Sequence, residues 1–371
     1  MKTIAILFGS TFLLGQMRTT APSEVGMSKQ GLEQAAKLLG DEVSSGHVTS
    51  AAIIVVRKDR VVLHRGFGAQ ADTPFLLASI SKPVTAAALM LLVERGQVSL
   101  QDSVSVHLKE FSGKDRAAIR VRDLLSHTSG LPDMLAENVA LRRKHAPLSE
   151  FVKGSMTTPL LFEPGKDFSY QSMGILLAAE IVERVSGQRL RDFLDKEFFE
   201  PLGMRNTFLG LMGRKVKDTA QAQPVTGQNV GEWAEFGWNS HYWRDLGAPW
   251  GGLHSTTSDL AVFLQMFLNG GSYNGVRVLS PATVTAMTHD QNQHIDRPWG
   301  LGWGLSTSPV WAYFGDLVSL RTFGHSGATG TVAWADPNRQ LITVILTTRP
   351  SSEDGGRLLR NVSNAVTGSV D

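Results

Sequence analysis

An uncharged apolar run at residues 83–93 constrains the fold of this chain more than any other feature. It is long enough for about three helical turns, and it is apolar on every side, so a helix built from it belongs in the protein interior. Pro83 has no backbone N–H and therefore fits only the first helical turn. The helix must begin close to Ser79, and the rest of the chain has to fold around it.

Ser79 and Lys82 stand at the start of this helix. Positions i and i+3 share a helical face, so a hydroxyl and an amine at this spacing can approach within proton-transfer distance. The pair offers a nucleophile and a base. Serine is also a common N-cap residue and a Ser-x-x-Lys tetrad occurs by chance, so a catalytic interpretation needs support from elsewhere in the chain.

Tyr170 and Ser172 give the first support. They directly precede a segment with apolar residues at helical spacing that stops at Gly187. We therefore expect Tyr170 on a loop entering a helix, where its phenol can project into a cleft. The alternative is a packing role for Tyr170, with Ser172 as an N-cap.

The glycine-rich segment 324–328, Gly-His-Ser-Gly-Ala, gives the second. Its small residues would let a substrate lie against the backbone, and a free N–H there could stabilise an oxyanion. The segment also matches the Gly-x-Ser-x-Gly elbow of α/β-hydrolases, in which the serine lies between a strand and a helix. Because residues 331–335 and 341–347 are both strand-like, we expect a hairpin instead, which disfavours Ser326 as the nucleophile.

Together these segments resemble the serine β-lactamase and penicillin-binding protein superfamily, most closely class C β-lactamases, DD-peptidases and family VIII-type esterases. The resemblance covers nearly everything from about Pro22 to the C-terminus. It includes further matches in order along the chain: Leu-Leu-Ser-His-Thr-Ser-Gly-Leu at 124–131, Phe-Glu-Pro-Gly at 162–165, residues 251–259, Trp-Gly-Leu-Gly-Trp-Gly at 299–304, and Asp-Pro at 336–337.

The resemblance implies catalytic roles for three residues. Ser79 matches the acylated nucleophile, and Lys82 matches its proton acceptor or activating charge. Tyr170 matches the tyrosine of the family's Tyr-x-Asn motif, which works with the lysine as general base and then as general acid.

It also implies a substrate-binding strand. His325, Ser326 and Gly327 match the family's Lys-Thr-Gly motif. The backbone N–H groups of Ser79 and Ala328 match its oxyanion hole, in which one donor is typically worth about 10²- to 10³-fold in rate.

Two residues depart from the family pattern. Ser172 replaces the asparagine of Tyr-x-Asn, so an amide with two polar ends becomes a short hydroxyl. His325 replaces a permanently charged lysine, and an ordinary imidazole is mostly neutral near pH 7. Both changes weaken the expected binding of a β-lactam. We also expect activity to change as His325 titrates.

We therefore expect a carboxylesterase-like serine hydrolase that acts on ester or amide bonds through an acyl-enzyme. The alternatives are a D-alanyl-D-alanine carboxypeptidase or D-amino-acid peptidase, a class C-type β-lactamase and, more remotely, a catalytically silent peptidoglycan-binding protein. The expected partner is a small-molecule ester, β-lactam or D-peptide.

The resemblance and the strand pattern predict an α/β (α+β) fold, in which an antiparallel sheet flanked by helices is built from both chain ends around an inserted, mainly helical domain. We expect strands at 51–56, 61–65, 331–335 and 341–347, and helices at 31–43 and 357–366. The predicted sheet domain spans 22–96 and 251–371, and the helical domain spans 97–250. Clefts between domains are where ligand sites tend to lie.

Other patterns exclude several function classes. The net charge is +2 and no basic stripe is present, so nucleic acid is not an expected partner. Nucleotide-binding glycine fingerprints are missing, and His289 and His294 lack metal-ligand spacing, so neither cofactor nor metal is expected. His127 suits hydrogen bonding to backbone at a turn. The tryptophans at 233, 238, 243 and 250 suit anchoring of an irregular segment better than lining a pocket.

The N-terminus suggests export. Residues 3–15 form an uncharged apolar run behind Lys2, a length that suits a signal-peptide core and is too short to span a bilayer. Residues 1–21 are thus predicted to be a signal peptide or N-terminal extension of a periplasmic or secreted protein. Pro22 spoils a cleavage site after Ala21, which leaves an N-terminal strand or anchor, and a cytoplasmic location, as the alternative.

Overall fold

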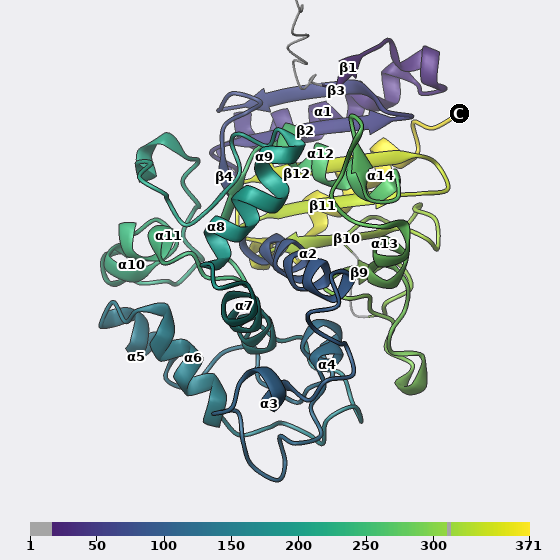
Figure 1. Ribbon diagram of the computed structural model, residues 1–371. Coiled ribbons are helices and arrows are strands. Elements are labelled where there is room, and N and C mark those ends of the chain that lie inside the picture. Colours follow the sequence, from purple (N-terminus) through teal and green to yellow (C-terminus); the bar gives the residue numbers. More distant parts are fainter. Residues whose placement is uncertain (1–16, 310–312) are drawn as a thin grey trace, which may run out of the picture.

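The computed structural model describes residues 17–309 and 313–371. Its main feature is a seven-stranded sheet (Figure 1). The strand order is β1-β3-β2-β12-β11-β10-β9. The strands come from both chain ends: β1 (Arg18–Thr19), β2 (Ala51–Arg57), β3 (Arg60–Phe67), β9 (Gly304–Leu305), β10 (Phe323–Gly327), β11 (Thr331–Asp336) and β12 (Leu341–Thr347). β2 lies antiparallel to β12, with Ala51 opposite Thr347, and this pairing joins the two ends.

The predicted strands are all present, with ends that differ by a few residues at most. Lys58 and Asp59 form the turn of the first hairpin, and both have positive φ angles, 49° and 61°. That is the backbone shape of the two-residue hairpin turns that match strand twist. The predicted sheet from both chain ends is confirmed, except that β1 pairs with β3 in parallel.

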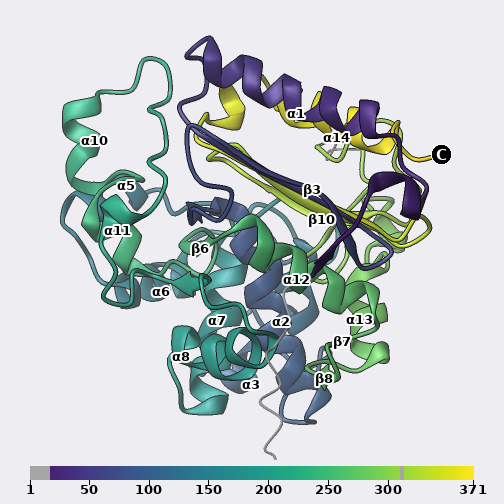
Figure 2. The same cartoon turned by 90° about the horizontal axis from the view of Figure 1, so that it is seen from above.

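Helices cover both faces of the sheet. Seen from above (Figure 2), α1 (Lys29–Ser44) and α14 (Arg357–Thr367) lie on one face, and α2 (Ser81–Glu94) and α12 (Thr257–Leu268) lie on the other. Successive residues of β2 alternate between the two cores, Ile53 facing α1 and α14 while Ile54 faces the opposite side. A strand buried on both faces has no polar side, which is why its sequence is an unbroken apolar run.

The apolar run at 83–93 forms the predicted interior helix, α2, which is buried from Ser81 to Leu92. Pro83 lies in its first turn, as its missing N–H requires. The helix begins at Ser81, and Ser79 lies just before it in the short 3-10 helix η2 (Ala78–Ile80). α2 packs against α7 (Met173–Ser186), which ends at Gly187 as predicted.

The remaining elements surround this frame. Between α2 and α12 lie α3 (Val104–His107), α4 (Val121–Ser126), α5 (Asn138–Arg143), α6 (Leu148–Thr157), α8 (Leu190–Leu194), η3 (Asp195–Phe199), α9 (Glu200–Leu202), η4 (Val216–Asp218), α10 (Val230–Phe236) and α11 (His241–Leu246). A small sheet pairs β4 (Phe75–Leu76), β6 (Leu253–Ser255) and β5 (Phe208–Leu209). The others are η1 (Pro22–Val25), β7 (Ser272–Tyr273), β8 (Val276–Arg277), α13 (Pro281–Thr288), η5 (Gln293–Ile295) and η6 (Ser351–Glu353).

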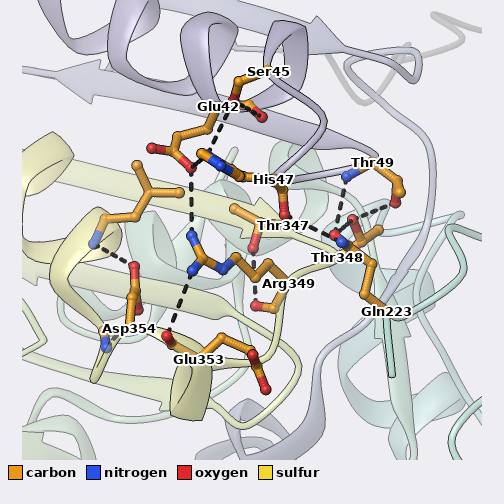
Figure 3. Close-up of polar contacts among 12 residues, drawn as sticks. Glu42, Ser45, His47, Thr49, Gln223, Thr347, Thr348, Arg349, Glu353 and Asp354 are labelled. Carbon is orange, nitrogen blue, oxygen red and sulfur yellow. Dashed lines mark hydrogen bonds and ion pairs between the residues drawn. The ribbon is translucent and has the colours of Figure 1, made fainter. Parts of the chain in front are cut away.

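A polar network fastens the segment before α10 to the end of the sheet (Figure 3). The Gln223 side-chain oxygen accepts from the Thr49 N–H at 3.0 Å and from Thr348 Oγ1 at 3.1 Å. Arg349 pairs with Glu42 of α1 at 3.4 Å. These contacts join three stretches that are far apart in sequence, so the loop-rich segment is fixed relative to the sheet.

The N-terminal apolar run at residues 3–15, with its predicted signal peptide, lies outside the described residues. Arg18 and Thr19, which belong to the predicted extension, pair with Arg60 and Val61 of β3. Within residues 17–309 and 313–371, no helix combines the length and the apolar character needed to cross a membrane.

Candidate active site

The backbone before Ser79 is pressed against the turn between β10 and β11. Thr329 Oγ1 donates to the Leu76 carbonyl at 2.7 Å, and Thr331 Oγ1 donates to the Leu77 carbonyl at 3.0 Å. A Cβ on Gly327 would lie only 2.1 Å from the Leu77 oxygen, so only glycine fits there. These contacts set the distance between Ser79 and the sheet.

The turn into η2 carries backbone strain next to Ser79. Ala78 has a φ of 48°, a left-handed conformation that costs energy for a residue with a Cβ. The Ser81 hydroxyl donates to the Ala78 carbonyl at 2.6 Å and accepts from the Leu253 N–H at 3.0 Å. The strained turn is therefore tied to both α2 and β6, which holds Ser79 in one position.

Lys82 is completely buried beside the serine. Its Nζ donates to Ser79 Oγ at 2.9 Å and to the Trp250 carbonyl at 3.2 Å. Burial lowers the pKa of Lys82 to about 7, and the negative charge of Asp133 opposes this shift. At neutral pH much of the lysine is an uncharged amine that can accept the serine proton through the same contact.

Tyr170 lies close to both Lys82 and Ser79. Lys82 Nζ is 4.6 Å from the centre of its ring. Burial raises the pKa of the Tyr170 phenol well above its ordinary value; a hydrogen bond with Ser79 opposes the rise, and the charge of Asp133 adds to it. Tyr170 therefore stays protonated at neutral pH, which suits a proton donor better than a base.

His127 holds the loop that carries Tyr170. It ends α4 in a left-handed conformation, with a φ of 63°. Its carbonyl accepts from the Ser169 N–H at 3.1 Å, and its Nδ1 accepts from the Gln171 N–H at 3.3 Å. The predicted bonding of His127 to backbone is confirmed. The sequence did not indicate that its ring would also lie against Tyr170, with ring centres 4.8 Å apart.

His325 is fully buried in β10. Its Nδ1 is 2.7 Å from the Ser326 carbonyl, so Nδ1 carries the proton. Burial and then the nearby charge of Lys82 lower the pKa of His325 to about 3, against the opposing effect of the Ser326 carbonyl. The expectation that activity follows the titration of His325 is wrong for neutral pH, because this imidazole is already uncharged there.

Trp299 packs among these groups and removes water from them. Its ring centre lies 5.1 Å from that of His127, 6.1 Å from Tyr170 and 6.0 Å from His325. The tryptophan belongs to the Trp-Gly-Leu-Gly-Trp-Gly segment, which carried the family resemblance without a stated role. The burial that shifts the pKa values of the neighbouring residues comes in part from this side chain.

The site thus places a serine hydroxyl, a lysine of lowered pKa, a protonated phenol and a glycine-rich strand together. A model of the beta-lactamase family matches residues 33–367. This protein belongs to the beta-lactamase family.

Named relatives of this family member fall into several activity classes. A "Putative D-alanyl-D-alanine carboxypeptidase" from Salmonella agona (strain SL483) is 28% identical over 91% of this chain and 87% of its own length. The structure of EstCE1, "a hydrolase with promiscuous acyltransferase activity", superposes with a TM-score of 0.76 at 21% identity, over 91% of this chain and 99% of that one. A penicillin-binding protein homologue from Caulobacter crescentus gives a TM-score of 0.76 at 22% identity, over 93% and 99%. At this identity the two structures show the fold alone.

The β10 segment of this beta-lactamase family member has no nucleophile elbow. Ser326 pairs with Val332 in an antiparallel hairpin, so the segment runs from strand to turn to strand. Ala328 is exposed at the turn, and its N–H has no hydrogen-bond acceptor in the part of the chain that the structure describes. That N–H can therefore serve an oxyanion, and it follows directly after Gly327, which lies against the Leu77 carbonyl two residues before Ser79.

Ser172, the first departure from the family pattern, points to a residue that the sequence did not single out. It occupies the N-cap position of α7, but its hydroxyl does not cap the helix. Instead, Ser172 Oγ donates to Asp133 Oδ1 at 2.6 Å, and the Ser172 N–H donates to the Asp133 carbonyl at 3.3 Å. Asp133 belongs to an irregular Leu-Pro-Asp segment without periodicity, so no sequence signal places it at the site.

Two of the four tryptophans anchor the segment before β6. Trp243 and Trp250 are buried, and the Arg142 guanidinium lies 3.9 Å from the ring centre of Trp243. Anchoring was the favoured expectation. Trp250 also contributes its carbonyl to Lys82, a backbone role that side-chain patterns do not reveal.

Proposed function

We propose that this protein is a serine hydrolase that cleaves carboxylic esters through an acyl-enzyme on Ser79. The observation that carries the proposal is the 2.9 Å contact between Ser79 Oγ and the buried Lys82 Nζ, whose pKa is lowered to about 7. A nucleophile needs an adjacent base that is uncharged at the working pH, and this pair meets both requirements.

Acylation begins when the Lys82 amine takes the proton from Ser79 and the serine oxygen attacks the ester carbonyl. The oxyanion receives hydrogen bonds from the N–H groups of Ser79 and Ala328. Collapse breaks the bond to the alcohol, which takes a proton from the Tyr170 phenol, and Lys82 returns its proton to the tyrosine. Water then attacks the acyl group with the same proton path in reverse, which releases the acid and restores Ser79.

The charges around the serine favour an ester over a β-lactam. His325 replaces the cation that the family strand offers to a substrate carboxylate, and its pKa of about 3 keeps it neutral. Ser172 is engaged by Asp133 and so is less available to an acyl-chain amide. EstCE1, whose fold this chain shares, is a hydrolase, which is in line with an esterase assignment.

The second candidate activity is that of a D-alanyl-D-alanine carboxypeptidase, the activity assigned to the Salmonella agona relative. The substrate of such an enzyme is a peptide that ends in a carboxylate. The neutral His325 gives that group no ionic partner, so we rank this activity below ester hydrolysis.

A three-substrate comparison tests the proposal. Purified protein should hydrolyse 4-nitrophenyl butanoate faster than a chromogenic cephalosporin, and it should release little D-alanine from a D-alanyl-D-alanine peptide. A fluorophosphonate probe should modify Ser79, as peptide mass spectrometry can establish, and Ser79→Ala should abolish both labelling and turnover while Ser326→Ala retains labelling. A cephalosporin rate far above the ester rate, or labelling that persists in Ser79→Ala, would overturn it.

A further inference from the structure

The groups that surround Ser79 are mostly uncharged at neutral pH. Burial lowers the pKa of both His127 and His325, so both imidazoles are neutral, and it keeps the Tyr170 phenol protonated. Lys82 loses much of its charge for the same reason. A substrate that reaches Ser79 therefore meets little fixed positive charge.

Asp133 differs from these groups because it is exposed. Two contacts hold it at the site: its Oδ1 accepts from Ser172 Oγ at 2.6 Å, and its carbonyl accepts from the Ser172 N–H at 3.3 Å. Ser172 lies two residues beyond Tyr170, so the carboxylate is fixed to the loop that carries the tyrosine.

The charge of Asp133 reaches the reacting groups. It acts on both Lys82 and Tyr170, in each case favouring the protonated form. A charge that acts on these two residues also acts on a charged substituent of a substrate bound at Ser79 beside them. Because Asp133 is exposed, such a substituent can approach its carboxylate from the solvent side.

We propose that Asp133 is a specificity-determining residue, and that it selects esters with a positively charged ammonium group near the scissile carbonyl over neutral and anionic ones. The inference rests on the proposed ester hydrolysis. We expect a preference of about 3- to 10-fold in kcat/KM, which corresponds to roughly 1 kcal/mol, the size of the interaction between two unit charges across partly solvated space.

Two series of isosteric esters test the inference, with the charge placed first on the alcohol and then on the acid. The first series comprises the butanoates of choline, 3,3-dimethylbutanol and 2-sulfoethanol. The second comprises the ethyl esters of 4-(trimethylammonio)butanoate, 5,5-dimethylhexanoate and 4-sulfobutanoate. Rates are followed by pH-stat at about pH 8.5, above the Lys82 pKa of about 7, so that changes in lysine ionisation contribute little.

In at least one series we expect kcat/KM to fall about 3- to 10-fold from the cationic to the neutral ester, and again to the anionic ester. Asp133→Asn should bring the three rates close together, while the neutral ester changes less than about threefold. The asparagine keeps an acceptor oxygen for Ser172. Added salt should weaken the wild-type preference, because the carboxylate is exposed.

Two matched variants separate charge from structure. Ser172→Ala removes the hydroxyl but keeps the carboxylate, so much of the preference should remain. Asp41→Asn makes the same change in net charge on α1, across the sheet from the site, and should leave the preference intact. Equal preferences in wild type and Asp133→Asn, or an equal loss for all three esters, would overturn the specificity role alone. Failure of wild type to hydrolyse even the neutral esters would overturn the proposed function, and this inference with it.

Discussion

The two sides of the candidate active site are built on different physical principles. The sheet side, which consists of β10 and its turn to β11, fixes Ser79 through close backbone contact, with Gly327 against Leu77 and two threonine hydroxyls on successive carbonyls. The helical side, which consists of the start of α2 and the loop before α7, brings in Lys82 and Tyr170, and it buries the lysine and the tyrosine hydroxyl. The sheet side determines the position of Ser79, and the helical side determines the proton affinity of Lys82 and Tyr170.

The difference teaches that position and reactivity can be altered separately. Steric contact at Gly327 depends on the volume of one side chain and hardly on pH. The lowered pKa of Lys82 depends on burial of its amine, which opposes the stability of the fold whenever the lysine is charged. A substitution on one side should therefore leave the property set by the other side intact, so that it can still be measured.

The largest effect on activity is expected when the helical side loses the amine of Lys82. Lys82→Met keeps the shape of the buried side chain but should reduce kcat/KM for 4-nitrophenyl butanoate by about 10³-fold or more. The unfolding midpoint should stay the same or rise, because no ammonium has to be desolvated.

The pH dependence of stability checks this interpretation of Lys82. In wild type the folded lysine has a pKa of about 7 and the unfolded one an ordinary value of 10.5, so stability should fall as pH falls through that window. Lys82→Met should lack this contribution. A variant that is inactive because it has unfolded would contradict the separation of the two sides.

A smaller loss of activity is expected when the sheet side is disturbed. Gly327→Ala places a methyl group 2.1 Å from the Leu77 oxygen and 2.4 Å from Thr331 Oγ1, and should destabilise the protein by about 1–3 kcal/mol in urea unfolding. Displacement of Ser79 should also lower ester turnover by up to about 100-fold in the folded protein.

Gly231→Ala is the matched control for this change, because the nearest heavy atom to the added Cβ is Asn229 Oδ1 at 3.6 Å. It should fold and react like wild type. If Gly327→Ala behaved in the same way, the turn would not be what positions the serine.

The smallest effect is expected in the pH profile. Because the base must be uncharged, kcat/KM should rise with pH through about 7 and then level off, following Lys82. His325→Gln should change the rate only a few-fold and keep this midpoint, since His325 is neutral far below it. A midpoint that moved by a unit or more in His325→Gln would assign the titration to the histidine instead.

Much of the fold followed from local patterns. The run at 83–93 required an interior helix, the paired apolar runs at both ends gave the strands of one sheet, and Gly187 ended α7 where it was expected. These predictions succeeded because periodicity, proline and glycine act within a few residues. Family-like motifs then named the candidate site residues Ser79, Lys82, Tyr170 and the β10 strand.

Local patterns did not reveal how the site is surrounded. Asp133 reaches Ser172 across 39 positions, and the Trp250 carbonyl reaches Lys82 across 168. Neither contact leaves a periodic signal, because each depends on where separate elements meet. The tertiary structure also corrected the expected charge of His325. With an ordinary pKa this imidazole would titrate close to neutral pH.

The sequence by itself determined which chemical groups are available and which elements carry them: a serine and a lysine one helical turn apart, a tyrosine before a helix, and a glycine-rich strand. Only the tertiary structure decided their state of charge. Proton affinity depends on how much water and how many charges surround a group, and in this protein those surroundings are assembled from segments distant in the chain.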